Sequence, residues 1–343
     1  MRKMLNTLFV TSEEAYLALE NENVAVYRDS ERAAQYPLQV LEGILCFSYK
    51  GASPALMGEC VRRGIGLSFL TPSGRLLARA AGESQGNVLL RKEQYRVSDS
   101  PERSCRVARN FIFGKVYNAR WVLERTLRDH GLRVNADALR CASNDIQAQL
   151  KPILDSEDLD ALRGLEGKAS ARYFGVWDEM ILNQKEDFRF EGRNRRPPLD
   201  RVNAALSMAY TLLTHDCAAA LESVGLDAYA GFMHRDRPGR ESLALDLMEE
   251  LRAPLADRLV ITMINTRALQ KNHFRRQSGG AVLLTDDGRK VLLGAWQTRK
   301  KEEITHPFLK EKLPWGLIPY VQALLLARHL RGDLEQYPPF LWK

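Results

Sequence analysis

Long hydrophobic runs are missing from this sequence of 343 residues. No stretch approaches the roughly 18 consecutive apolar residues of a membrane-spanning helix, so we expect no membrane insertion. Cysteine is also sparse, because the five cysteines are scattered and form no CxxC pair. This spacing argues against a zinc ribbon or a disulfide framework. The first ten residues lack the apolar core of a signal peptide, and together these absences predict a cytoplasmic protein.

Nucleotide-binding motifs are absent as well. The sequence contains neither GxGxxG nor GxxxxGK(S/T), so a reaction driven by nucleotide hydrolysis is not indicated. Neither sign of charge dominates strongly, because 50 Lys and Arg residues stand against 43 Asp and Glu residues. This modest positive surplus permits a polyanionic partner but does not require one.

A change of sequence period divides the chain. Short β-prone runs lie within residues 7–29. Residues 53–64 have the N-terminal cap, early proline and final glycine that are typical of a helix. The stretch GESQGN then breaks the pattern. We predict an α+β fold with a small N-terminal β domain at 1–84, a linker at 85–90 and a larger helical domain at 91–343.

The second domain repeats its apolar residues at spacings of three and four, which is the period of amphipathic helices. Helices are expected over residues 104–131, 134–154, 158–181, 201–225 and 316–332. Residues 278–297 differ, because short apolar runs flank the turn sequence DDG. We predict a β-hairpin there, inserted into an otherwise all-α domain.

One short segment near the middle of this domain is very apolar and yet acidic. The helix predicted from Ser242 is mostly Leu, Met and Ala but contains Asp246, Glu249 and Glu250. At about 100° per residue the acids share a narrow stripe opposite the apolar arc. This stripe is either a solvated edge or the wall of a groove, and we interpret the helix as buried on most sides. Spacing does not separate Glu249 from Glu250.

Together with these acids, two residues elsewhere in the sequence suggest a metal-binding site. His234 lies a dozen residues before Asp246, and Glu166 lies among small residues in RGLEGKASARYF. Two carboxylates and one imidazole can bind a divalent metal. Carboxylate oxygens suit Mg²⁺ and Mn²⁺, and an imidazole shifts the preference toward Mn²⁺. Taken singly, each of these residues is better explained as an ordinary surface or core residue.

Basic residues gather in the loops beside these positions. They are Arg193, Arg195 and Arg196 before the double proline, and Arg235, Arg237 and Arg240 between His234 and Asp246. Arginine is suited to bidentate contact with phosphate. Acids flanked by basic loops are what a metal-dependent phosphodiester site requires, whereas solvated loops without a ligand are the alternative interpretation.

Over nearly its whole length the sequence resembles the CRISPR-associated Cas-one integrases, most closely the subtype I-C branch. The motifs that carry the resemblance include GKVYNAR, LEGKASARYF, RPPLDRVNAALSMAYTLL and GLDAYAGFMHRDRPGRESLALDLMEELR. The resemblance implies a β domain followed by an all-helical domain and a homodimer formed through the β domains. It also implies a complex in which a Cas-two dimer bridges two integrase dimers.

The resemblance further implies roles for individual residues. The positions that match the family's metal ligands are Glu166, His234 and Glu249, and Asp246 matches an assisting acid one turn earlier. Tyr173 matches an aromatic residue near the site. Asn203 matches a characteristic asparagine, which we expect to order the loop or the ligands.

The reaction implied by the resemblance is DNA integration. The 3′-hydroxyl of a short double-stranded fragment would attack a phosphodiester at a CRISPR repeat boundary, with Mn²⁺ or Mg²⁺ bound. Two alternatives stay open, namely a DNA-binding scaffold without chemistry and a general nuclease for branched DNA.

Overall fold

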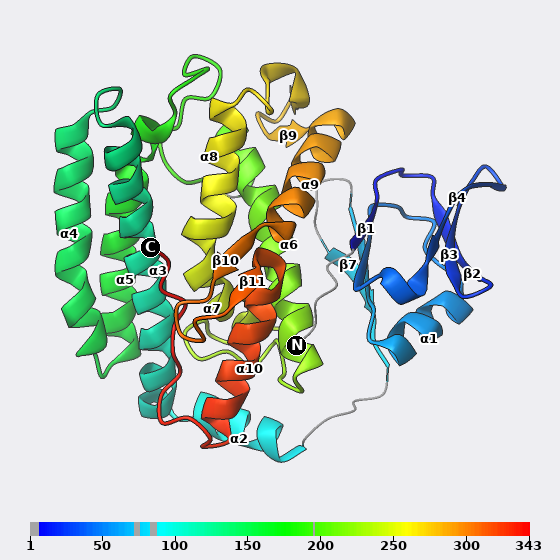
Figure 1. The fold of residues 1–343 in the computed structure, drawn as a ribbon, viewed down its shortest axis with the longest axis horizontal. Helices are drawn as coiled ribbons and strands as arrows, with labels where there is room; N and C mark the ends of the chain where they lie inside the picture. The colour runs from blue at the N-terminus through cyan, green and yellow to red at the C-terminus, as the bar shows by residue number, and fades with distance from the viewer. Residues whose placement is uncertain (1–6, 72–75, 83–87, 195) are drawn as a thin grey trace.

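A computed structural model describes residues 7–71, 76–82, 88–194 and 196–343 of the chain. It is a mixed α+β structure, with a strand-rich part at the N-terminal end and a larger helical part beside it (Figure 1). The two parts are built around separate clusters of buried hydrophobic side chains. The candidate residues that the structure describes all lie in the helical part.

Two small sheets and one helix form the strand-rich part. The first sheet has the order β1-β5-β6-β7, in which β7 alone is antiparallel to its neighbour. Its strands are Thr7–Val10, Gly43–Cys46, Gly66–Leu70 and Leu76–Ala80. The second sheet is an antiparallel meander of β2, β3 and β4, at Tyr16–Glu20, Asn23–Arg28 and Glu31–Pro37. These strands confirm the predicted β-rich character of the first residues.

Helix α1, at Pro54–Arg63, begins and ends as its sequence predicts. The Ser53 side chain accepts a hydrogen bond from the Leu56 N–H, which satisfies one of the unpaired donors of the first turn. Gly64 closes the helix with a φ of 69°, a left-handed conformation that favours glycine.

The helices predicted in this part are confirmed as α3 Pro101–His130, α4 Ala136–Leu154, α5 Leu159–Gly175, α6 Arg201–Ser223, α7 Ser242–Leu251 and α10 Ile318–Leu330. Helix α5 ends earlier than predicted and is followed by a short 3-10 helix at Trp177–Met180. Helices α2 Val88–Ser98, α8 Arg258–Asn265 and α9 Asp286–Lys301 were not among the predicted helices. Because α2 begins at Val88, the last three residues of the expected linker are helical. Residues 83–87 of the GESQGN stretch lie outside the described residues, so the domain boundary stays a prediction.

The hairpin predicted at 278–297 is wrong in its position. The DDG sequence starts α9 instead of forming a turn, because the Thr285 hydroxyl accepts a hydrogen bond from the Gly288 N–H. Aspartates in the first turn add to this, since negative charge is favourable at a helix N-terminus. The strand pairs lie to either side, as β8–β9 (Phe274–Arg276, Val282–Leu284) and β10–β11 (Glu303–Thr305, Lys312–Pro314).

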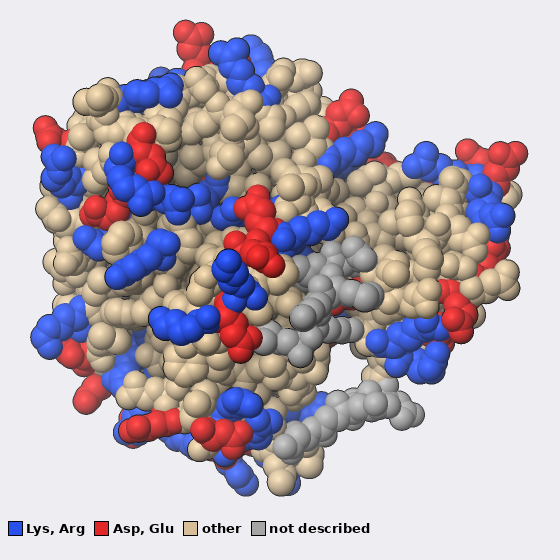
Figure 2. Space-filling model, viewed as in Figure 1, with Lys and Arg blue, Asp and Glu red and all other residues tan. Residues whose placement is uncertain are grey.

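Ion pairs join the two parts of the molecule. Arg79 of β7 contacts Glu222 and lies 3.1 Å from Glu241, both in the helical part. On the face shown in Figure 2, the described Lys, Arg, Asp and Glu side chains are mixed and form no large patch of one sign. Among the described residues, no helix is long and apolar enough to cross a membrane.

Helix α7 lies deep in the helical part, where it packs against α3, α6 and α10. All of its residues except Leu245 are buried. The prediction that its acids form one polar stripe along a groove is therefore wrong. Each of its acids is buried and has different partners, as described next.

Candidate active site

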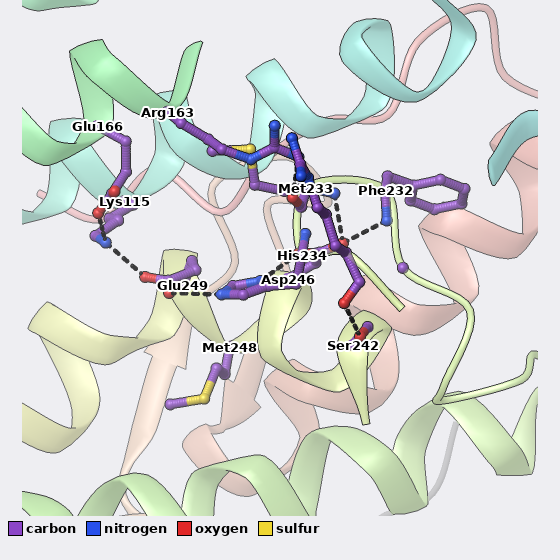
Figure 3. Close-up of polar contacts among 12 residues, drawn as sticks. Lys115, Arg163, Glu166, Phe232, Met233, His234, Ser242, Asp246, Met248 and Glu249 are labelled. Atoms are coloured by element: carbon purple, nitrogen blue, oxygen red, sulfur yellow. Dashed lines mark hydrogen bonds and ion pairs between the residues drawn. The ribbon is translucent and has the colours of Figure 1, made fainter. Parts of the chain in front are cut away.

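Two carboxylates from different helices meet at one lysine. Glu166 lies on α5, Glu249 lies on α7, and Lys115 of α3 contacts both (Figure 3). The Lys115 ammonium nitrogen is 2.9 Å from Glu249 Oε2. The Ser170 hydroxyl donates a 2.7 Å hydrogen bond to Glu166 Oε1. Because α3 packs against both α5 and α7, the fold brings together three charges that are far apart in the sequence.

Asp246 sets the orientation of His234. This fully buried carboxylate accepts hydrogen bonds of 2.6, 2.9 and 3.0 Å from the backbone N–H groups of Phe232, Met233 and His234. Its Oδ1 atom also lies 2.6 Å from His234 Nδ1. Since a carboxylate can only accept, a neutral ring carries its proton on Nδ1 and keeps a lone pair on Nε2. That Nε2 atom is 4.0 Å from Glu249 Oε1.

Other contacts hold the loop that carries His234. Arg163 of α5 donates a 3.0 Å hydrogen bond to the Met233 carbonyl (Figure 3). The Ser242 hydroxyl donates to the Arg235 carbonyl at 3.2 Å. Gly231 permits this close packing, because a Cβ atom there would lie 2.7 Å from the Ser242 Cβ. The loop is therefore tied to both helices that carry the carboxylates.

A π-helical segment from Arg252 to Asp257 directly follows α7, and such segments often occur at functional sites. It places an Arg252 guanidinium nitrogen 2.9 Å from Glu249 Oε1 and stacks the same group over the Tyr210 ring. Tyr210 and Tyr173 donate hydrogen bonds of 2.6 and 3.0 Å to Asp257. Tyr173 therefore supports the segment that positions Arg252.

Glu250 belongs to a different cluster although it is adjacent to Glu249. Its carboxylate accepts hydrogen bonds from the Tyr337 hydroxyl, from Gln322 Nε2 at 3.2 Å and from the Phe340 N–H at 2.5 Å. These partners come from α10 and the segment that follows it. The structure thus separates two acids that the sequence period left unresolved, and only Glu249 lies beside His234.

The adjacent residues Glu249 and Glu250 have pKa values shifted in opposite directions. Burial alone would raise the pKa of Glu249, but the charges of Arg252 and Lys115 outweigh it and lower the pKa to about 2. For Glu166, burial is likewise outweighed, chiefly by Lys115, and the pKa is lowered. Burial raises the pKa of Glu250 to about 7. At neutral pH the site therefore presents two ionised carboxylates.

Asn203 organises the loop that precedes α6. Its Oδ1 atom accepts hydrogen bonds from Arg193 at 2.5 Å and from the Asn194 N–H at 3.1 Å. Its amide nitrogen donates to the Gly192 carbonyl at 2.8 Å. The Arg193 guanidinium also lies over the Tyr210 ring. Arg193 is thus half-buried and held close to Arg252, which stacks on the same ring.

The other predicted DNA-binding arginines differ in exposure. Arg196, Arg235 and Arg237 are exposed, and Arg240 is half-buried. Arg195 lies outside the described residues. A cavity of about 530 Å³ opens beside Glu166, and its lining includes Phe174, Phe190, Arg193 and Arg252. Its size suits a small ligand or part of a larger one, while contact between these arginines and DNA stays a prediction.

The side chains around Glu166, His234 and Glu249 decide whether a divalent metal fits this site. The described residues contain no group of three or more His, Cys, Asp or Glu side chains arranged to hold a metal ion, and the Lys115 ammonium contacts both carboxylates. The donor types nevertheless fit, because two ionised carboxylates and one imidazole Nε2 suit Mg²⁺ or Mn²⁺. Glu249 Oε2 is also buried without a well-aligned hydrogen bond.

Lys115 and Arg252 contact candidate residues, and Arg163 contacts the loop that carries His234, but none of the three was predicted from the sequence. Lys115 lies in GKVYNAR, one of the motifs that carried the family resemblance, so the sequence already marked its segment as part of the family pattern. Arg252 follows the acidic helix at i+3 from Glu249, a spacing that brings side chains together on a helix. Arg163 had no comparable signal.

An oriented histidine beside two buried carboxylates, with arginine-bearing loops nearby, defines a candidate metal-dependent phosphodiester enzyme. Residues 8–298 match the family described as CRISPR associated protein Cas1, and the chain belongs to this family. The CRISPR-associated endonuclease Cas1 2 of Rhodospirillum rubrum is 51% identical over 348 residues, and the alignment covers 100% of both chains.

Two solved structures share the fold. A casposase bound to its integration product has a TM-score of 0.85 and 21% identity, covering 99% of this chain and 95% of the other. A chain of a Cas6-RT-Cas1–Cas2 complex has a TM-score of 0.82 and 21% identity, covering 100% of this chain and 36% of the other. At these identities the comparison extends to the fold alone.

Proposed function

We propose that this protein is a CRISPR spacer-acquisition integrase of antiviral defence, which joins short DNA fragments to CRISPR repeat DNA. The observation that carries the proposal is the proximity of Glu166, His234 and Glu249, which come from α5, a loop and α7. Family membership supports it, since the Rhodospirillum rubrum relative is named an endonuclease. The casposase bound to an integration product has the same fold.

Glu166, His234 and Glu249 are the proposed ligands of one Mn²⁺ or Mg²⁺ ion. Bound there, a divalent metal would supply Lewis-acid chemistry, which would lower the pKa of an attacking hydroxyl and offset negative charge on the phosphoryl oxygens. Asp246 keeps the Nε2 lone pair of His234 available by holding the ring proton on Nδ1. Because a histidine must be neutral to bind a metal, metal affinity should fall at acid pH.

The proposed reaction exchanges one phosphodiester for another. The 3′-oxygen of the fragment forms a bond to the target phosphorus, and the bond from that phosphorus to the bridging oxygen of the target strand breaks. The attacking hydroxyl gives its proton to solvent, and the leaving oxygen takes up a proton from solvent to become a free hydroxyl. No nucleotide hydrolysis is required, which agrees with the missing nucleotide motifs. If water attacks instead, the same site cleaves DNA.

Exposed arginines are proposed to hold the DNA backbone around the site. Arg196, Arg235 and Arg237 are exposed, so their guanidinium groups can reach phosphates. Arg193 and Arg252 line the cavity beside Glu166, where they would meet the phosphates nearest the reacting centre. Arg195 and Arg240 complete the set of proposed DNA contacts.

The proposed assembly is the one that the resemblance to the Cas1 family implies. Residues 1–84 would form the dimerisation domain, 85–90 the linker and 91–343 the catalytic domain. Two such dimers would be bridged by a dimer of Cas2, the Cas-two partner. The shared fold with a chain of a complex containing Cas1 and Cas2 supports this arrangement. We also assign the chain to the subtype I-C branch and to the cytoplasm of a prokaryote.

The test is a joining assay with Glu166→Ala. A labelled fragment with a free 3′-hydroxyl is incubated with repeat DNA, Cas2 and Mn²⁺, and DNA binding is measured in parallel. We expect joining to fall by about 100-fold or more with DNA affinity retained. Glu157→Ala, at an exposed glutamate close in sequence, should join as the unmodified protein does.

Two outcomes would contradict the proposal. Joining that survives Glu166→Ala would mean that the chain is a DNA-binding scaffold for chemistry performed elsewhere. Cleavage of branched DNA that needs neither Cas2 nor a repeat, in place of joining, would identify a general nuclease.

A further inference from the structure

We infer that Lys115 is a built-in competitor of the metal, whose ammonium group must leave Glu166 and Glu249 before a divalent cation can bind them. The inference rests on the proposed function, because it takes those two carboxylates as metal ligands. Until the metal replaces it, Lys115 balances the negative charge of the two acids.

The first argument is the sharing of oxygen atoms. Lys115 contacts Glu166 Oε1 and lies 2.9 Å from Glu249 Oε2. The lysine side chain is 11% exposed and that of Glu249 is 5% exposed, so little water screens these charges. A divalent cation bound to both carboxylates would lie close to this ammonium group. The repulsion between the two cations makes simultaneous occupation unfavourable.

The second argument is that other contacts keep the carboxylates in place when the lysine moves. Ser170 donates a hydrogen bond to Glu166 Oε1, and Arg252 lies 2.9 Å from Glu249 Oε1. Asp246 holds His234 independently of Lys115. The flexible four-carbon chain of lysine can withdraw its charge without backbone movement. The ligand set would therefore survive the exchange of one cation for another.

An ordinary structural ion pair would use the same contacts, but it predicts a different response. If Lys115 only supported the ligands, its removal would weaken metal binding, as removal of supporting side chains usually does. If Lys115 competes with the metal, its removal must strengthen metal binding. The sign of the change in affinity therefore separates the two roles.

The experiment measures Mn²⁺ binding to the full-length protein by titration calorimetry, without DNA. The variants are Lys115→Met and Lys115→Gln, and the control is Lys168→Met, at an exposed lysine on the same helix as Glu166. We expect both Lys115 variants to bind Mn²⁺ at least about tenfold more tightly than the unmodified protein. A change of this size is within the usual range of energetic coupling in proteins. Lys168→Met should bind as the unmodified protein does.

Thermal unfolding gives a second readout. With EDTA present, Lys115→Met should melt at a lower temperature than the unmodified protein, because the buried Glu249 and the half-buried Glu166 lose a counter-charge. Saturating Mn²⁺ should raise its melting temperature by more than it raises that of the unmodified protein. If Lys115→Met does not fold, Lys115→Gln, whose amide still donates to a carboxylate, decides the question.

Equal or weaker Mn²⁺ binding by the folded Lys115 variants would overturn the inference while leaving the proposed metal site intact. A Glu166→Gln variant distinguishes this result from failure of the proposed function. If the unmodified protein binds Mn²⁺ and Glu166→Gln does not weaken the binding, the proposed ligand set is wrong and the inference fails with it.

Discussion

Replacing Asp246 with asparagine should disable the proposed metal site without removing a proposed ligand. Asp246 accepts hydrogen bonds from three backbone N–H groups and from His234 Nδ1. Asparagine has nearly the same shape but replaces one acceptor oxygen with a donor NH₂ group. With that group facing His234, Nδ1 becomes the acceptor and the ring proton moves to Nε2. The nitrogen proposed to bind the metal then has no lone pair to offer.

The contacts of Asp246 set the size of the expected losses in Mn²⁺ affinity and in stability. Side chains that orient a metal ligand usually contribute 10- to 100-fold to metal affinity, so we expect Mn²⁺ to bind Asp246→Asn about 10- to 100-fold more weakly. The oxygen that accepts from Phe232 and Met233 can be retained, whereas the His234 N–H would face a donor. Hydrogen bonds to charged groups contribute about 1.5–3 kcal/mol each, so the free energy of unfolding should fall by about 2 kcal/mol.

Glu250→Gln is the matched control for this prediction. Glu250 lies on the same helix, is fully buried and accepts a hydrogen bond from the Phe340 N–H, so its loss should also reduce stability. Mn²⁺ titration and urea unfolding are measured on the same samples. Both variants should be less stable, but only Asp246→Asn should bind Mn²⁺ more weakly. Unchanged Mn²⁺ affinity in Asp246→Asn, or an equal loss of affinity in Glu250→Gln, would show that Asp246 does not prepare His234 for metal binding.

Two further predictions concern DNA and pH. Changing Arg193, Arg195 and Arg196 together to alanine should weaken DNA binding and flatten its salt dependence by about one unit of slope per lost phosphate contact; an unchanged slope in anisotropy titrations would place them off the DNA path. Burial, with Arg79, lowers the pKa of His215 from 6.5 to about 4. Below pH 6.5 the unfolded chain is protonated first, so up to about 3 kcal/mol of stability should be lost as the pH falls to 4. In urea unfolding, His215→Leu should remove this loss and His130→Leu, at an exposed residue, should keep it; equal pH profiles would contradict the assignment.

Local sequence signals predicted the elements well wherever one signal dominated. The long recurrence of apolar residues at spacings of three and four predicted α3. The N-terminal cap at Ser53 and the final glycine at Gly64 predicted α1. The DDG stretch failed because it carries two conflicting signals. A turn sequence and a capped helix start share the same residues, and the Thr285 cap decides between them. Single-sequence reasoning has no means of weighing the two.

The candidate site was predictable only in part. The resemblance identified Glu166, His234 and Glu249, and helix geometry placed Asp246 on the same helix as Glu249. Helix geometry did not predict that the acids of this helix would themselves be buried. Once it is buried, each acid needs its own partners, and those come from distant segments. Lys115 lies 134 positions before Glu249 in the printed sequence, so its role depends on how α3 packs against α7.

We propose that Glu249, together with Glu166 and His234, carries the chemistry. The most direct test compares Glu249→Gln with Glu250→Gln, two isosteric changes at adjacent buried residues. Joining of a labelled 3′-hydroxyl fragment to repeat DNA is measured with Mn²⁺ and Cas2, at a temperature where both variants are folded. We predict that Glu249→Gln loses about 100-fold or more of the joining rate, while Glu250→Gln stays within a few-fold of the unmodified protein. Retained joining by Glu249→Gln, or an equal loss in both variants, would contradict the account.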